Sequence, residues 1–124
     1  MELFIQIGGL IVMPIILLIS GYLIKKHPPR KPNIWYGYRT PRSMKNDDLW
    51  KEGNRYAANL LIYLSTFLVF VNILLSAFYQ AEIFEDENSI ITLSGIIVIT
   101  ITTILFPITE YHLYKYEKKN KQED

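Results

Sequence analysis

The residues best equipped for chemistry gather between positions 33 and 59, where basic, aromatic and amide side chains are interleaved. Arg39 offers a planar fork of guanidinium donors, which suits a phosphate or a carboxylate. Trp50 and Asn54 are four residues apart, a spacing that places two side chains on one face of a helix. One hypothesis is therefore a loop that folds back on neighbouring helices, with Arg39 binding a lipid phosphate or an internal carboxylate.

Other side chains in this stretch could assist such binding. Arg42 and Lys45 add positive charge, which anionic lipid attracts by about 1 kcal/mol per residue at a membrane surface. Ser43 and Asn46 can donate or accept hydrogen bonds locally. The simpler alternative is that the basic residues only fix membrane topology and the aromatic residues only anchor the chain at the interface. We prefer that alternative for an earlier basic group: Lys25, Lys26, Arg30 and Lys31.

Catalytic and metal-binding chemistry has little support outside this stretch. The chain has no cysteine, which excludes disulfides, a thiol nucleophile and a zinc–thiolate site. Its two histidines are His27, which lies among lysines, and His112, which follows Glu110 by two residues. Neither arrangement matches a metal site or a catalytic triad, so we expect no enzyme activity, no cofactor and no metal.

Three uncharged apolar blocks must position the central stretch: residues 3–24, 57–78 and 90–108. Each is long enough to form a helix across a hydrocarbon core of about 30 Å. Charged residues are confined to the segments between and after the blocks, which favours membrane spans over a soluble core. A cleaved signal peptide is an alternative for the first block. That block, however, exceeds an apolar signal region of about 7–15 residues, and its lysines follow it.

Local signals place the ends of the helices. Pro28 must break the first helix. Asn46 is a typical N-cap followed by two acidic residues, and nothing breaks the second helix until about Gln80. Because a helix over residues 47–80 is longer than the membrane, its first turns must project or lie along the interface.

Side-chain chemistry also predicts which way the second helix faces. Trp50 and Asn54 are expected to point at protein, and Lys51 and Arg55 at headgroups or water. Asn72 falls in the middle of the second apolar block. We expect it to make an interhelical hydrogen bond, worth about 0.6–2 kcal/mol, rather than to contact a substrate.

Together these features predict one all-α membrane domain over residues 1–124, with a structured cytoplasmic loop at 33–56 and a charged tail at 109–124. Lysine and arginine crowd between the first two spans and return in the tail, whereas residues 80–89 are acidic. The positive-inside rule therefore predicts an N-terminus outside the cell and a cytoplasmic C-terminus. The net charge of +1 gives no reason to expect nucleic-acid binding.

The order of residues in the loop adds a resemblance. The run Gly37-Tyr38-Arg39-Thr40-x-x-Ser43-Met44-Lys45-Asn46-x-x-x-Trp50-x-x-x-Asn54 resembles the signature of the SdpI/YfhL family of bacterial membrane proteins. The resemblance implies a plasma-membrane protein that gives immunity to a secreted, membrane-active peptide toxin. In the type member of the family the same protein also takes part in signalling, by holding a small repressor at the membrane.

The resemblance and the residues leave three functions to compare. The first is immunity or toxin resistance. The alternatives are a sensor or scaffold that recruits a cytosolic regulator through residues 33–56 and, less favoured, a small membrane enzyme acting on lipid or peptide. The candidate partners are thus the bilayer with its anionic headgroups, a peptide toxin and a cytosolic regulator. The expected binding residues are Gly37, Tyr38, Arg39, Thr40, Ser43, Lys45, Asn46, Trp50 and Asn54.

Overall fold

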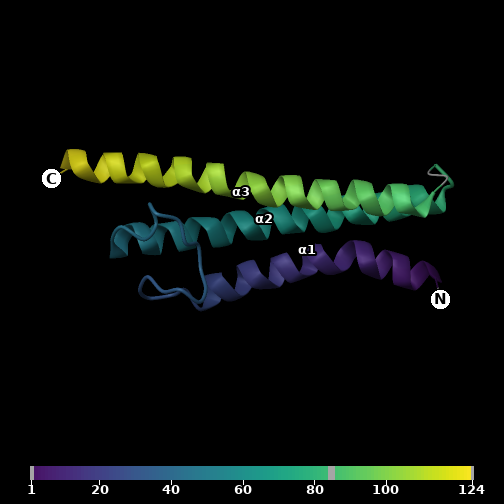
Figure 1. The fold of residues 1–124 in the computed structure, drawn as a ribbon, viewed down its shortest axis with the longest axis horizontal. Coiled ribbons are helices and arrows are strands. Elements are labelled where there is room, and N and C mark those ends of the chain that lie inside the picture. The colour runs from purple at the N-terminus through teal and green to yellow at the C-terminus, as the bar shows by residue number, and fades with distance from the viewer. Residues whose placement is uncertain (1, 84–85, 124) are drawn as a thin grey trace.

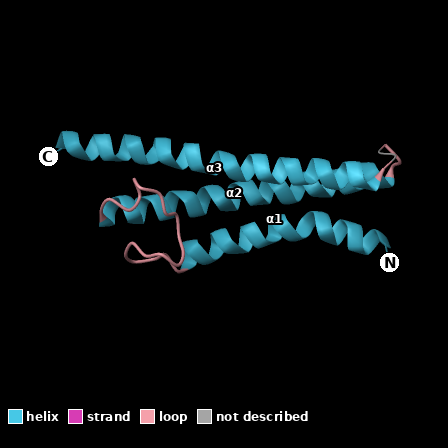
Figure 2. Ribbon diagram, in the orientation of Figure 1, coloured by secondary structure: helices cyan, strands magenta, loops and turns pink. Residues whose placement is uncertain are grey.

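The computed structural model describes residues 2–83 and 86–123, and all regular secondary structure within these ranges is helical (Figures 1 and 2). The helices are α1 (Glu2–Lys26), α2 (Asp47–Gln80) and α3 (Glu87–Glu123). Each of the three is long and apolar enough to cross a membrane. The expected all-α, multi-pass membrane fold is therefore confirmed.

The helices run side by side, and α2 packs against both of the others, whereas α1 and α3 make little contact (Figure 1). The N-terminus lies at the same end of the bundle as the connection between α2 and α3. The loop of residues 27–46 lies at the opposite end, which we call the loop end. There α3 extends past the start of α2 towards the C-terminus. The loop end is where the central stretch can meet all three helices.

The first helix ends where the sequence predicts. The backbone N–H of His27 still donates to the Leu23 carbonyl at 2.8 Å, and the prolines that follow cannot continue the helix. Pro14 lies inside α1, which bends near its middle (Figure 1). Gly21 allows α1 to approach α2 closely, because a Cβ there would lie 3.0 Å from the Ile62 side chain.

The second helix begins and ends as predicted. Asn46 caps it, and its side-chain oxygen accepts a hydrogen bond from the Leu49 backbone N–H at 2.8 Å. The helix then runs unbroken for 34 residues to Gln80. The predicted face is also confirmed, since Lys51 and Arg55 are exposed while a stripe on the other side is buried. That stripe contains Trp50, Asn54, Ala57, Ala58, Ser65, Leu68, Asn72 and Leu75.

Asn72 makes the interhelical hydrogen bond expected of it. The Ser94 hydroxyl of α3 donates to the Asn72 side-chain oxygen, and the Asn72 amide nitrogen donates to the Leu68 carbonyl at 2.8 Å. Asn72 and Ser94 are both buried. Pairing satisfies polar groups that have no water to bind at this depth, so this contact fixes α2 against α3.

The third helix is longer than its apolar block. The helix has 37 residues in total and continues past Pro107. The third span and most of the charged tail therefore form one helix. Away from the helix contacts the bundle presents apolar side chains, as a lipid-facing surface requires. Examples are Ile16, Ile19, Phe67, Phe70, Ile96 and Ile99.

Candidate functional site

Gly37 and Asn54 join the central loop to α2. Gly37 has a φ of +108°, a conformation that favours glycine, and a Cβ there would lie 2.5 Å from the Asn54 side-chain oxygen. The same oxygen accepts a hydrogen bond from the Tyr38 backbone N–H at 2.7 Å. The Asn54 amide nitrogen donates to the Trp50 carbonyl at 2.9 Å, and Asn54 is 1% exposed. One buried amide thus holds the loop, and only glycine fits beside it.

Trp50 holds the earlier part of the loop. Its indole N–H donates to the Pro29 carbonyl at 2.7 Å, and its side chain is fully buried. A buried indole N–H needs such an acceptor. The two residues predicted to face protein therefore both connect the loop to α2, Trp50 near its beginning and Asn54 near its middle.

Ser43 closes a tight turn in the loop. Its hydroxyl donates to the Tyr38 carbonyl at 2.9 Å and accepts from the Thr40 backbone N–H at 2.9 Å. Ser43 is fully buried. Gly53 of α2 makes room for it, because a Cβ at Gly53 would lie 3.3 Å from the Ser43 Cβ and 3.2 Å from the Leu113 side chain. The turn is therefore wedged between α2 and α3.

Glu110 of α3 is the loop's main acceptor on that helix. One of its oxygens accepts from the Tyr38 hydroxyl at 2.9 Å and from the Thr40 hydroxyl at 2.6 Å. Burial, reinforced by the hydrogen bond to Glu110 and the charge of that carboxylate, raises the pKa of the Tyr38 phenol above its ordinary value. Tyr38 is therefore a neutral donor at physiological pH. In the sequence, Glu110 is notable only as a neighbour of His112.

A second carboxylate of α3 binds the basic side of the loop. Arg42 contacts Glu117 at 2.5 Å, and Lys45 contacts the other oxygen of Glu117 at 3.1 Å. The Arg42 Nε also lies 3.4 Å from Glu110, although its N–H is not aligned for a hydrogen bond. Arg42 and Lys45 thus form ion pairs with carboxylates inside the protein.

His112 faces α2 rather than its neighbour Glu110. Its Nε2 lies 2.6 Å from a Glu52 oxygen, and its ring stacks on Tyr56 with centroids 3.8 Å apart. Glu52 also accepts two hydrogen bonds from Arg55, at 2.6 and 2.8 Å. Within the described ranges, no group of three or more histidines, cysteines and acidic residues could hold a metal. We interpret this cluster as a second polar contact that holds α2 against α3, in addition to the contact between Asn72 and Ser94.

Arg39 lies apart from these contacts. It is exposed, and one of its guanidinium nitrogens donates to the Ile34 carbonyl within the loop. The structure therefore divides the expected site residues into two sets. The buried network contains Gly37, Tyr38, Thr40, Ser43, Trp50 and Asn54. Arg39, Lys45 and Asn46 lie at its margins, and a role of any of the nine in binding stays a prediction.

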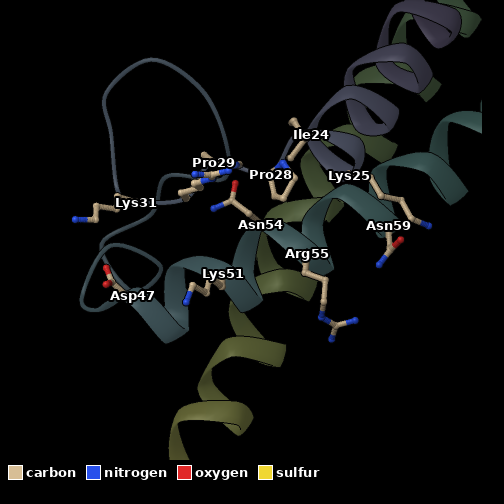
Figure 3. A pocket seen from close by; sticks show the side chains of 11 residues that line it. Ile24, Lys25, Pro28, Pro29, Lys31, Asp47, Lys51, Asn54, Arg55 and Asn59 are labelled. Atoms are coloured by element: carbon tan, nitrogen blue, oxygen red, sulfur yellow. The ribbon is translucent and has the colours of Figure 1, made fainter.

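A cavity of about 810 Å³ opens beside the network, between the end of α1 and the start of α2 (Figure 3). Five of its eleven lining residues are basic, and Asp47 is the acidic residue among them. Three of the basic residues belong to the group for which we preferred a purely topological role. The cavity is lined by Ile24, Lys25, Pro28, Pro29, Arg30, Lys31, Asp47, Lys51, Asn54, Arg55 and Asn59.

Comparison with known proteins agrees with the motif. Residues 30–109 match the SdpI/YfhL protein family, a range that includes the loop motif, α2 and all of α3's apolar block. The uncharacterized protein YfhL of Bacillus subtilis (strain 168) is 36% identical over 98 residues, which cover 79% of each chain. No solved structure matches significantly.

Proposed function

This chain belongs to the SdpI/YfhL family, and from that premise we propose that it confers immunity on a bacterial cell against a secreted, membrane-active peptide toxin. It acts in the plasma membrane as a binding protein and not as an enzyme. The observation that carries the proposal is the buried network that holds residues 37–54 against α2 and α3. A preorganised loop binds a partner without first losing conformational entropy.

The bonding within the network supports binding over catalysis. The Ser43 hydroxyl and the Asn54 amide are used in holding the loop, and the Tyr38 hydroxyl is bonded to Glu110. Groups occupied in this way position a surface, whereas an enzyme needs a nucleophile or base presented to a substrate. The surface they position is an exposed tip formed by Ile34, Trp35 and Tyr36.

The charge pattern supports an orientation for this surface. With the basic loop and the C-terminal part of α3 inside the cell, the tip lies at the inner boundary of the bilayer. Exposed Trp and Tyr side chains favour that boundary, where their rings are partly apolar and partly hydrated. A toxin that inserts into the membrane would meet the tip from within the lipid.

The test is survival of a toxin-sensitive bacterial host expressing this chain, challenged with candidate membrane-active peptides. We expect protection by the wild type and a marked loss of protection in Trp35→Ala, which is 83% exposed in the wild type. Tyr63→Ala is the matched control, because Tyr63 lies on the exposed face of α2 and is 74% exposed in the wild type. This variant should protect normally. Survival is normalised to protein in the membrane fraction. Equal sensitivity of hosts with and without the wild-type chain, across the peptide panel, would contradict immunity.

A sensor or scaffold is the second candidate, and the same exposed tip favours it. Ile34 is 74% exposed and Trp35 83% exposed, and an apolar tip outside the membrane can bind a soluble partner. A photoreactive amino acid at position 35 would distinguish the two functions in living cells. Crosslinking to one cytosolic regulator, with no change in toxin survival, would favour the scaffold; crosslinking to the peptide would favour immunity.

A further inference from the structure

Apart from Lys26 and Arg39, the basic residues between positions 25 and 55 fall into two classes. Arg42 and Lys45 contact Glu117, and Arg55 is paired with Glu52. The second class lines the cavity, and none of its members lies within ion-pair distance of a carboxylate in the described part of the chain. It consists of Lys25, Arg30, Lys31 and Lys51. Internal pairing thus accounts for the first class and leaves the second without a counterion.

The four residues of the second class line one cavity, along its length. Figure 3 shows Lys25 and Asn59 towards one end of the cavity and Lys31 and Asp47 towards the other, with Lys51 between them. Four cations against the single carboxylate of Asp47 leave a surplus of positive charge, because Arg55 is already neutralised by Glu52. A concave surface with such a surplus of positive charge attracts anions. Its volume of about 810 Å³ is ample for a phosphorylated headgroup.

The cavity also lies at the depth of a lipid headgroup. Ile24 is the last residue of the first uncharged block, and Lys25 follows it directly. Asn59 lies just inside the second apolar block. The cavity therefore lies at the membrane boundary, where Ile24, Pro28 and Pro29 form apolar parts of its wall among the basic side chains. A soluble anion gains nothing from such walls, whereas a lipid places its glycerol and upper acyl carbons against them.

We propose that this cavity binds the headgroup of an anionic phospholipid, with the four cations of the second class distributed along it as its phosphate-binding residues. Basic pockets between membrane helices are suited to lipid phosphates. The surplus of charge favours a lipid with two phosphodiester groups, such as cardiolipin, over phosphatidylglycerol with one. The site is separate from Arg39 and does not depend on the proposed immunity function, because lipid binding is measured without toxin.

The experiment measures lipid binding by the purified full-length protein. Vesicles contain phosphatidylcholine alone or with phosphatidylglycerol or cardiolipin at matched negative charge, and inorganic phosphate and glycerol phosphate serve as free anions. We expect tightest binding to cardiolipin, weaker binding to phosphatidylglycerol and little competition by either free anion. Each lost cation should weaken binding about fivefold, so Lys31→Gln with Lys51→Gln should weaken it roughly 25-fold.

A matched pair of substitutions controls for total charge. Lys115→Gln with Lys118→Gln removes two lysines of α3 that lie outside the cavity lining, and this variant should bind cardiolipin nearly as the wild type does. Lys31→Arg with Lys51→Arg preserves the charge and should retain binding even if the glutamine variant folds poorly. Equal weakening by both glutamine pairs, or loss of binding in the arginine pair, would overturn the proposed site. Competition by free phosphate as strong as by cardiolipin would overturn the lipid as its ligand.

Discussion

The side-chain oxygen of Asn54 accepts a hydrogen bond from the backbone N–H of Tyr38 at 2.7 Å, across a separation of 16 residues. A buried backbone N–H outside regular structure must find an acceptor, and here a helix side chain provides it. The contact brings the loop so close to α2 that Gly37 has no room for a Cβ. The glycine and the asparagine of the motif therefore depend on each other.

Asn54→Leu tests this dependence. Leucine has the same branched shape, although it is larger, and it leaves the Tyr38 N–H without its acceptor, so we expect a loss of about 1–3 kcal/mol in the free energy of unfolding. Asn59→Leu, on the same helix but outside the network, is the control and should cost much less. Chemical unfolding in detergent micelles, followed by circular dichroism, measures both. If the two variants were equally stable, the hydrogen bond between Asn54 and Tyr38 would contribute nothing measurable to the free energy of unfolding.

Gly37→Ala and Gly95→Ala are predicted to change stability in opposite directions. At Gly37 the alanine would be strained at a φ of +108° and would clash with Asn54, which should cost about 1–3 kcal/mol. At Gly95, inside α3, a Cβ meets no atom within 4 Å, so alanine should stabilise the helix by about 0.5–1 kcal/mol. Unfolding midpoints of the two variants, measured side by side, give the comparison. A neutral Gly37→Ala would contradict the fit described here.

The helices could be predicted because their signals are local. The uncharged blocks, Pro28 and the Asn46 cap each act on neighbouring residues, and α2 accordingly has its predicted bounds. The end of α3 is different. The polar residues after Ile108 mark the end of the apolar block, but nothing there except Pro107 opposes a helix, and the helix continues. A change in composition locates a membrane boundary better than it locates a helix end.

The partners of the loop could be predicted only in part. Trp50 and Asn54 were expected inside because helical spacing places them on one face. The contact between Tyr38 and Glu110 spans 72 residues of sequence, and no local pattern identifies it. One clue was available: Glu110 lies in the first polar turn after the third apolar block, at the same membrane level as the loop. The basic cavity could not be predicted, because it depends on how α1 and α2 are placed relative to each other, and a count of charges does not contain that information.

The Tyr38 phenol should resist ionisation. Its pKa is raised by burial and by Glu110, so the folded protein keeps it neutral at a pH where the unfolded chain ionises it near 10. The stability that this neutral phenol contributes is full below about pH 10 and is lost as the pH rises further. The absorbance difference between wild type and Tyr38→Phe should therefore contain no phenolate signal near pH 10 in the folded state. The denatured pair should regain it, and a phenolate signal in the folded pair would contradict the prediction.

The orientation can be tested with single cysteines, since the chain has none of its own. Asn88→Cys lies near the acidic connection and Met44→Cys in the loop, and both positions are exposed. The positive-inside rule predicts that a membrane-impermeant thiol reagent labels position 88 in intact cells and position 44 only after permeabilisation. The reversed pattern would place the loop outside the cell and rule out a cytosolic regulator as its partner.

Arg39→Lys separates geometry from charge. Lysine keeps the positive charge that sets topology but loses the planar fork, one nitrogen of which now holds the Ile34 carbonyl. If the remaining donors of Arg39 bind a phosphate or a carboxylate of a partner, the single ammonium nitrogen of lysine cannot reproduce both contacts in the geometry of the planar fork. We therefore expect survival under toxin challenge to fall by about tenfold or more while the protein remains in the membrane at near-normal abundance.

Arg30→Lys is the control for that substitution. Arg30 lies outside the motif, and lysine preserves its charge at the basic cavity, so protection should stay close to the wild-type level. Survival is again normalised to protein in the membrane fraction. Equal protection by Arg39→Lys and the wild type would remove Arg39 from the binding site. Loss of the Arg39→Lys protein from the membrane would instead make the arginine a structural residue, whose bond to Ile34 holds the loop in place.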